Sequence, residues 1–164
     1  IPTDRYKSYL ERNLKEGKDI KIITNSLESA SHISDKGYLV GLPDMRDLVS
    51  KGLSLNEWLG VTMEEKDNLV YLHEKVMLFD DDHGIIGSHN FGAGSTSVSS
   101  EISLEFYSKP IAQSLIKDFD SEFEDAATTK KATLELLDKE ISENKFMIRL
   151  LHLRPIKTIV KELY

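Results

Sequence analysis

The stretch LVYLHEKVMLFDDDHGIIGSHNF, residues 69–91, constrains the fold more than any other part of the sequence. Two runs rich in Val, Ile, Leu and Phe flank three consecutive Asp residues and a Gly. This pattern is typical of two strands joined by a tight turn, which we place at 81–84. A chain with such a hairpin in its middle is expected to fold around a sheet.

The segments around the hairpin alternate between helix and strand. Residues 4–16 have apolar side chains at helical spacing and are followed by Gly17, which suits the left-handed conformation found after a helix. The other expected elements are strands at 19–25, 53–59 and 101–108, a short helix at 43–51 with Pro43 in its first turn, and loops at 26–42 and 92–100. This order of elements is an α/β pattern.

The sequence from Lys109 onward shows helical patterns only, at about 109–126, 130–143 and 145–163. We therefore expect two parts in the chain. Residues 1–126 should form an α/β unit with a mixed β-sheet flanked by helices. Residues 127–164 should form a helical C-terminal extension that packs on this unit or on a membrane.

Composition limits the classes of function and site. The 164 residues carry a formal net charge of −7, which works against nonspecific nucleic-acid binding because that binding depends on clustered Lys and Arg. The chain has no cysteine, so disulfides and thiolate metal sites are excluded. No run approaches the roughly 20 apolar residues that a membrane-spanning helix needs. We expect a peripheral membrane or cytoplasmic location.

The hairpin carries polar residues that together suit one kind of reaction. His73 and Lys75 are two residues apart, so on a strand their side chains project from the same face. The turn then brings Ser88 and Asn90 back toward them. An imidazole, an ammonium, a hydroxyl and a carboxamide fit a phosphodiester, with His as nucleophile or proton donor and the others as donors to oxygen. No metal is required, because fixed donors stabilise the charge on phosphorus.

Each of these residues has an ordinary explanation when it is taken alone. A single His on a strand is usually structural, the Gly-Ser-x-Asn run is a common loop, and residues 80–82 would make a hairpin turn of solvated acids. The combination is different, because six fixed identities follow the pattern HxK(x)4D(x)6GSxN from His73 to Asn90. Such a match is improbable by chance and indicates a functional site.

The segment HEKVMLFDDDHGIIGSHNF resembles the HKD signature of the phospholipase D superfamily, without a gap or a substitution. The resemblance implies a histidine that attacks phosphorus to give a phosphohistidine, and a second histidine that protonates the leaving group. His73 would be one of these two. Weaker similarity to the C-terminal half of bacterial cardiolipin synthase-like proteins extends to IKIITNSLESAS, MRDLVSKGLSLNEW and FMIRLLHLRPIKTIV.

The same resemblance assigns roles to the remaining motif residues. Lys75 and Asn90 would hold phosphate oxygens, and Ser88 would assist them. Asp80 would support the motif structurally. Glu101 stands eleven residues after Asn90, where the family places an acid that orients the histidine.

This chemistry needs two histidines, and the chain supplies one complete motif. His83 and His89 lack their own Lys and Asp at the required offsets, so we expect both to be structural or rim residues. The second histidine then comes from a missing N-terminal half or from a homodimer partner. We expect the missing half, because residues 1–3 resemble the end of an interrupted strand.

The expected function is phosphodiester hydrolysis or transfer on a phospholipid substrate, without a cofactor or metal. One alternative is an endonuclease of the same superfamily, which would place a basic groove around His73 and act on nucleic acid. Another is an isolated half that binds a phosphate or a partner without turnover. Residues 145–161 set basic beside large apolar residues, which is typical of a helix on an anionic membrane or of a packed helix with a solvated basic edge.

Overall fold

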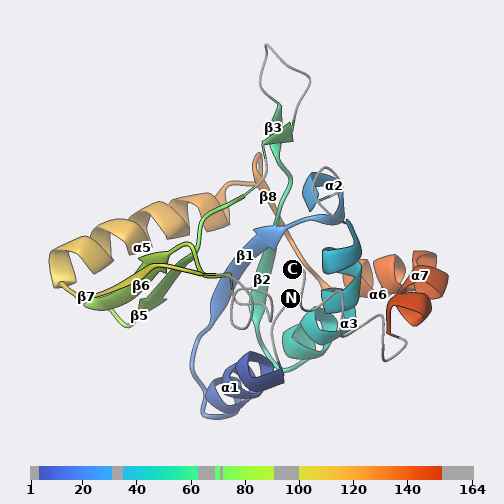
Figure 1. Ribbon diagram of the computed structural model, residues 1–164, viewed down its shortest axis with the longest axis horizontal. Coiled ribbons are helices and arrows are strands. Elements are labelled where there is room, and N and C mark those ends of the chain that lie inside the picture. Colours follow the sequence, from blue (N-terminus) through green and yellow to red (C-terminus); the bar gives the residue numbers. More distant parts are fainter. Residues whose placement is uncertain (1–3, 31–34, 63–68, 71, 91–99, 153–164) are drawn as a thin grey trace.

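Figure 1 shows the computed structural model of the chain, which describes residues 4–30, 35–62, 69–70, 72–90 and 100–152. The loop expected at 92–100 and the last part of the helix expected at 145–163 fall almost entirely outside these residues. The elements are α1 (Asp4–Lys15), β1 (Lys21–Asn25), α2 (Leu27–Ala30), α3 (Asp35–Ser50), β2 (Ser54–Trp58), β3 (Val61–Thr62), β4 (Leu69–Val70), β5 (Val76–Phe79), β6 (His83–Gly87), β7 (Ser103–Tyr107), α5 (Lys109–Glu124), β8 (Thr129–Lys131), α6 (Leu134–Glu143) and α7 (Lys145–Leu151).

The first sheet is mixed and has the order β1-β2-β8. Strands β1 and β2 run parallel and are connected through α2 and α3, which makes a βαβ unit. Strand β8 pairs antiparallel with the other edge of β2. The expected class, α/β with a mixed sheet flanked by helices, is confirmed.

Strand β8 corrects the expectation that the chain is helical throughout after Lys109. The Ala132 N–H donates to the Leu55 carbonyl at 2.9 Å, and the Leu59 N–H donates to the Thr128 carbonyl at 2.8 Å. These bonds satisfy backbone groups along the open edge of β2. The helix expected from residue 130 therefore begins only at α6, where the Thr133 side chain accepts a hydrogen bond from the Leu136 N–H.

Helix α3 corrects the expectation of a loop at 26–42. The helix begins at Asp35, and Pro43 lies in its interior rather than in its first turn. Two glycines and a proline weaken the helical pattern of this segment in the sequence. Leu39, Val40 and Leu42 are nevertheless buried, so packing of this face stabilises a helix that local propensity does not predict.

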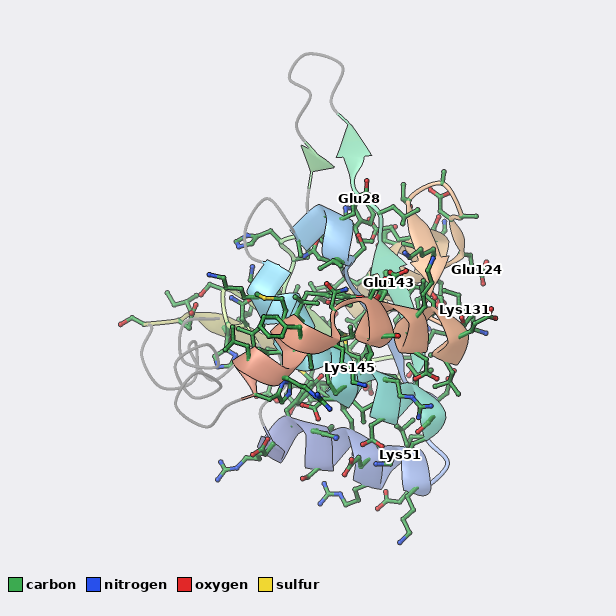
Figure 2. The ribbon with its side chains drawn as sticks, turned by 90° about the vertical axis from the view of Figure 1, so that its right-hand side faces the viewer. Glu28, Lys51, Glu124, Lys131, Glu143 and Lys145 are labelled. Carbon is green, nitrogen blue, oxygen red and sulfur yellow. The ribbon has the colours of Figure 1, made fainter. Side chains whose placement is uncertain are left out.

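The hydrophobic core lies between the first sheet and the helices α1, α3, α6 and α7. Its buried members are Leu10, Tyr38, Leu39, Val40, Leu42, Leu48, Leu53, Leu55, Ala132, Leu137, Ile148 and Leu151. Figure 2 views the molecule from the side of α6 and α7, where Glu143 and Lys145 mark the junction of these two helices. The core thus takes residues from both ends of the chain.

A second, antiparallel sheet has the order β5-β6-β7 and contains the predicted hairpin. Its turn lies at residues 80–82, and β5 begins only at Val76. The continuous strand expected from Leu69 is wrong, because Leu69–Val70 forms β4 and pairs with β3 instead. Residues 72–75 therefore lead into β5 without being part of a strand.

Helix α5 lies along the second sheet and reaches the first one with its C-terminal end (Figure 1). The Lys109 ammonium lies 2.6 Å from Asp81 at the hairpin turn. At the other end of the helix, Asn56 of β2 donates to the Phe123 carbonyl at 2.6 Å. The helix thereby connects the two sheets. In the part of the chain that the structure describes, no helix is long and apolar enough to cross a membrane.

Candidate active site

The spacing of the motif places most of its residues at the open end of the β5-β6 hairpin, opposite the turn. The Gly87 N–H donates to the Lys75 carbonyl at 3.1 Å, and strand pairing begins next to it with Val76 opposite Ile86. These backbone bonds fix Lys75 beside the Gly-Ser-x-Asn segment. The hairpin therefore places Ser88 one residue beyond the backbone contact between Gly87 and Lys75.

Ser88 connects the end of β6 to the segment that precedes β7. Its hydroxyl donates to Glu101 Oε2 at 2.5 Å and accepts from the Ile102 N–H at 3.1 Å. Its own N–H donates to the Ile102 carbonyl at 2.9 Å. Glu101 is therefore held at the site by a side chain of the motif.

Lys75 lies close enough to Glu101 for their charges to interact. Burial lowers the pKa of the half-buried Lys75 ammonium, and the Glu101 carboxylate acts in the opposite direction. The ammonium donates to the His73 carbonyl at 2.7 Å. An ammonium, a carboxylate and a hydroxyl therefore gather at one place, next to the backbone of His73.

Gly87 permits this close approach of β6 and β7. A Cβ atom at this position would lie 2.7 Å from Ser103 Cα and closer still to the Ile102 carbonyl oxygen. Any larger residue would push the two strands apart. The glycine of the motif therefore has a structural reason in the packing of these two strands.

The side chains of His73 and Asn90 are exposed at the same end of the hairpin. His73 lies between Leu72 and Lys75, and Asn90 follows Ser88 by two residues. The structure thus brings Lys75, Ser88 and Glu101 together and places His73 and Asn90 on the segments that flank them.

Asp80 lies away from this group, in the turn at the opposite end of β5. Its φ of 51° is in the left-handed region, which Asp adopts more readily than most residues. The neighbouring Asp81 forms the ion pair with Lys109 of α5. Asp80 is thus placed where it shapes the hairpin turn.

His83 occupies the turn end of the hairpin as well. Its ring stacks on Tyr107 with centroids 4.3 Å apart and on Phe79 at 4.9 Å, and Nε2 lies 2.9 Å from Glu105 Oε1. These contacts agree with the structural role expected for this histidine. Among the described residues, no three His, Asp or Glu side chains are grouped so that they would hold a metal ion.

Asn25 is a residue near the site that the sequence interpretation did not single out. It ends β1, and its carboxamide bonds to both backbone groups of Leu72, directly before His73. A polar residue at the carboxyl end of a parallel strand is a known signal for a site in α/β folds. That signal was present in the sequence.

Comparisons with known proteins give a family and a fold. A family model described as cardiolipin synthase, phospholipase D-like domain, matches residues 2–123. The crystal structure of phosphatidylserine synthase from Haemophilus influenzae Rd KW20 has a similar fold, with a TM-score of 0.70 and 16% sequence identity. The similarity covers 99% of this chain and 39% of that chain, so this chain spans well under half of its length. No curated protein sequence matches.

Proposed function

The chain belongs to the cardiolipin synthase family of phospholipase D-like domains, and we propose that it supplies one half of an active site that transfers or hydrolyses phosphatidyl groups. The observation that carries this proposal is the group formed by Lys75, Ser88 and Glu101 beside His73. A fixed cation and fixed hydrogen-bond donors stabilise the charge that develops on a phosphoryl group. The net charge of −7 favours a lipid substrate over nucleic acid.

In the proposed mechanism, His73 is one of two histidines that act on the phosphodiester. One imidazole attacks phosphorus, so that a P–N bond forms while the P–O bond to the leaving group breaks. The other histidine donates a proton to the departing oxygen, then removes one from the water or alcohol that attacks the phosphohistidine. Lys75 and Asn90 hold the non-bridging oxygens.

In this proposal, Glu101 and Ser88 act as a pair. The carboxylate lies beside Lys75 and is fixed by the Ser88 hydroxyl at 2.5 Å. A carboxylate placed in this way orients an imidazole and stabilises its protonated form during proton transfer. Asp80 supports the hairpin turn and has no contact with the substrate.

The test of this function is His73→Ala in the full protein, assayed on vesicles that contain phosphatidylglycerol. We expect turnover and the acid-labile phosphohistidine, detected by mass spectrometry, to be lost while the fold stays intact. His83→Ala is the matched control, because it removes a histidine from the turn end of the same hairpin. Activity of His73→Ala within tenfold of wild type would contradict the proposal, as would loss of turnover in EDTA with recovery on adding a divalent ion.

We also propose that a second motif half covers the face of β7 next to the site. Strand β7 is an edge of its sheet among the described strands, and Ile102 and Leu104 are 82% and 65% exposed. Apolar side chains this exposed are typical of an interface. The partner is an N-terminal half of the same protein or a second copy of this chain. Comparing the turnover of this chain alone with that of a longer form distinguishes them.

Helix α7 is a proposed contact with the lipid surface. Phe146 and Leu150 are exposed on its outer side and alternate with the exposed cations Lys145 and Arg149. This combination suits an anionic membrane surface. The opposite side of the helix packs into the core through Ile148 and Leu151, so the helix holds its outer side in a fixed orientation.

A further inference from the structure

We propose that Asn25 is a positioning residue that fixes the backbone from which His73 projects; this inference rests on the function proposed above. The Asn25 Nδ2 donates to the Leu72 carbonyl at 2.9 Å, and the Leu72 N–H donates to Asn25 Oδ1 at 2.8 Å. Both backbone groups of the residue directly before His73 are therefore bonded by one side chain. The carboxamide takes the place of a peptide group on a neighbouring strand.

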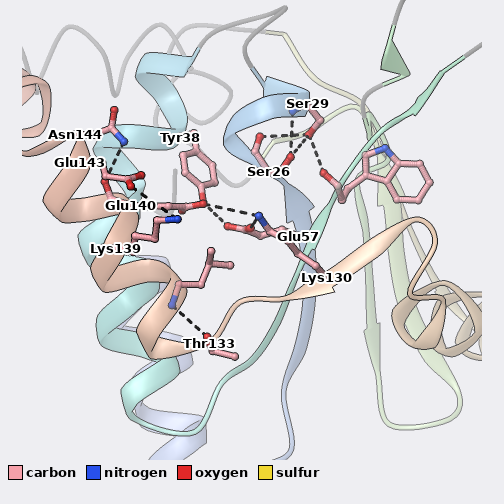
Figure 3. A network of polar contacts seen from close by, with 12 residues as sticks. Ser26, Ser29, Tyr38, Glu57, Lys130, Thr133, Lys139, Glu140, Glu143 and Asn144 are labelled. Atoms are coloured by element: carbon pink, nitrogen blue, oxygen red, sulfur yellow. Dashed lines mark hydrogen bonds and ion pairs between the residues drawn. The ribbon is translucent and has the colours of Figure 1, made fainter.

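The Asn25 carboxamide is itself held by a buried hydroxyl network. The Ser29 hydroxyl lies 3.3 Å from Asn25 Oδ1 and 2.9 Å from the Trp58 carbonyl. The Ser29 N–H donates to the Ser26 hydroxyl at 3.1 Å, and both serines are buried (Figure 3). The Ser29 hydroxyl has one proton and its shorter contact is to Trp58, so the network around it supports the orientation of the amide from the first sheet and α2.

The other end of the segment is attached to the second sheet. The Gly87 N–H donates to the Lys75 carbonyl at 3.1 Å, after which β5 and β6 pair. His73 therefore lies on a short segment with one attachment at Leu72 and another at Lys75. The Lys75 ammonium also donates to the His73 carbonyl at 2.7 Å. Loss of the attachment at Leu72 would therefore loosen the backbone of His73 and misplace its imidazole relative to Glu101, which is fixed by Ser88 at the start of β7.

The geometry explains why asparagine is suited to position 25. Aspartate would keep the acceptor for the Leu72 N–H and lose the donor to the Leu72 carbonyl. Glutamine is one methylene longer and would displace the amide from both groups. Alanine removes both hydrogen bonds and leaves the two backbone groups of Leu72 without this partner.

The first experiment compares steady-state kinetics of the full protein on phosphatidylglycerol vesicles. We expect Asn25→Ala to lower kcat about 10- to 100-fold, because small misplacements of a reacting group cost about this much. KM should change by less than about threefold, because the variant keeps Lys75 and Asn90 for phosphate binding. Asn25→Asp should fall between Asn25→Ala and wild type, since it keeps one of the two bonds.

Asn56→Ala is the matched control. Asn56 lies on the neighbouring strand β2, and its Nδ2 also donates to a backbone carbonyl, that of Phe123 at 2.6 Å. Its loss should lower the melting temperature comparably and leave kcat within about twofold of wild type. A value of kcat for Asn25→Ala within twofold of wild type, or an equal fall of kcat in Asn56→Ala, would overturn the positioning role.

The second experiment is hydrogen exchange at the Leu72 amide, which does not depend on activity. We expect exchange at least tenfold faster in Asn25→Ala than in wild type, and unchanged in Asn56→Ala. Unchanged exchange in Asn25→Ala would refute the attachment directly. If wild type shows no turnover, the proposed function fails, and the exchange measurement alone decides whether Asn25 holds this segment.

Discussion

At the scale of single residues, the hydrogen bonds of Ser88 bear on the role that its motif suggests. The sequence predicts a hydroxyl that assists phosphate binding. In the structure, its donor is used by Glu101 and its acceptor by the Ile102 N–H. In the proposed site, Ser88 would therefore act through the carboxylate that it fixes, and its backbone joins β6 to the segment before β7.

Replacing Ser88 by alanine should reduce stability as well as activity. The variant leaves Glu101 and the Ile102 N–H without this hydroxyl, and we expect the free energy of unfolding to fall by about 1 kcal/mol. Ser8→Ala is the control, because its hydroxyl donates to the Asp4 carbonyl within an exposed part of α1; its effect should stay within about 0.5 kcal/mol. Equal urea denaturation curves for the two variants would contradict this role of Ser88.

The sequence predicted the residues of the candidate site, but it did not predict the hydrogen bonds that attach the His73 segment to the first sheet. The hairpin was enough to expect Ser88 near Lys75, and the family resemblance placed Glu101 with them. Asn25 is 47 residues away from Leu72. A contact of this kind depends on how two sheets are placed, and local patterns contain no information about it.

At the scale of elements, a buried polar cluster joins helix α3, strand β2 and helix α6 (Figure 3). The Tyr38 hydroxyl contacts Glu57 Oε1 and lies 2.6 Å from Glu140 Oε2. The Lys130 ammonium of β8 lies 3.2 Å from Glu57 Oε2. A phenol has one proton to donate, so the second carboxyl contact is favourable when that carboxyl carries a proton itself.

Glu140 is the carboxyl of this cluster whose pKa is raised in the folded protein. Burial raises its pKa above the ordinary 4.5 and the Glu57 charge adds to the effect, while the Tyr38 hydrogen bond and Lys130 oppose it. A raised pKa in the folded state stabilises the protein fully below pH 4.5. This stabilisation is lost as the pH rises through the pKa of the folded protein.

The variant Glu140→Gln should remove this pH dependence, because its amide stays neutral. We expect its free energy of unfolding, relative to wild type, to increase between pH 4 and pH 7 in urea denaturation. Glu135→Gln, on an exposed position of the same helix, should keep a constant offset from wild type. A relative stability of Glu140→Gln that stays flat or decreases over this range would rule out a raised pKa of Glu140 in the folded protein.

Strand β8 and helix α3 are two elements that the sequence did not predict. Strand β8 is three residues long, Thr129–Lys131, and has no alternation long enough to distinguish it from the start of a helix. It is a strand because the edge of β2 offers unpaired backbone groups. Helix α3 was not predicted because its glycines and Pro43 lower its local helix propensity. Burial of one of its faces in the core outweighs that low propensity.

At the scale of the whole molecule, the core extends beyond the part that matches the family. The match ends at residue 123, whereas Ala132, Leu137, Ile148 and Leu151 are buried in the common core. Strand β8 also completes the first sheet. The described part of the extension is therefore expected to unfold together with the half that carries the motif.

Leu137→Ala tests this coupling. Leu137 is fully buried on α6, and we expect its replacement to lower the free energy of unfolding by about 2–5 kcal/mol. The chain has one tryptophan, Trp58, which lies on β2, outside the extension. If the protein unfolds as one unit, the urea unfolding transition measured by Trp58 fluorescence should shift to a lower urea concentration.

Leu134→Ala is the matched control on the same helix, because Leu134 is exposed and its loss should cost less than about 1 kcal/mol. If the extension were an independent unit, Leu137→Ala would melt α6 and leave the Trp58 transition where it is in wild type. If the extension shares the core, the Trp58 transition of Leu137→Ala should lie at a lower urea concentration than that of wild type. The Leu137→Ala substitution in α6 should then destabilise the first sheet, which contains Asn25. Because Asn25 bonds to Leu72, the segment that carries His73 should be destabilised as well.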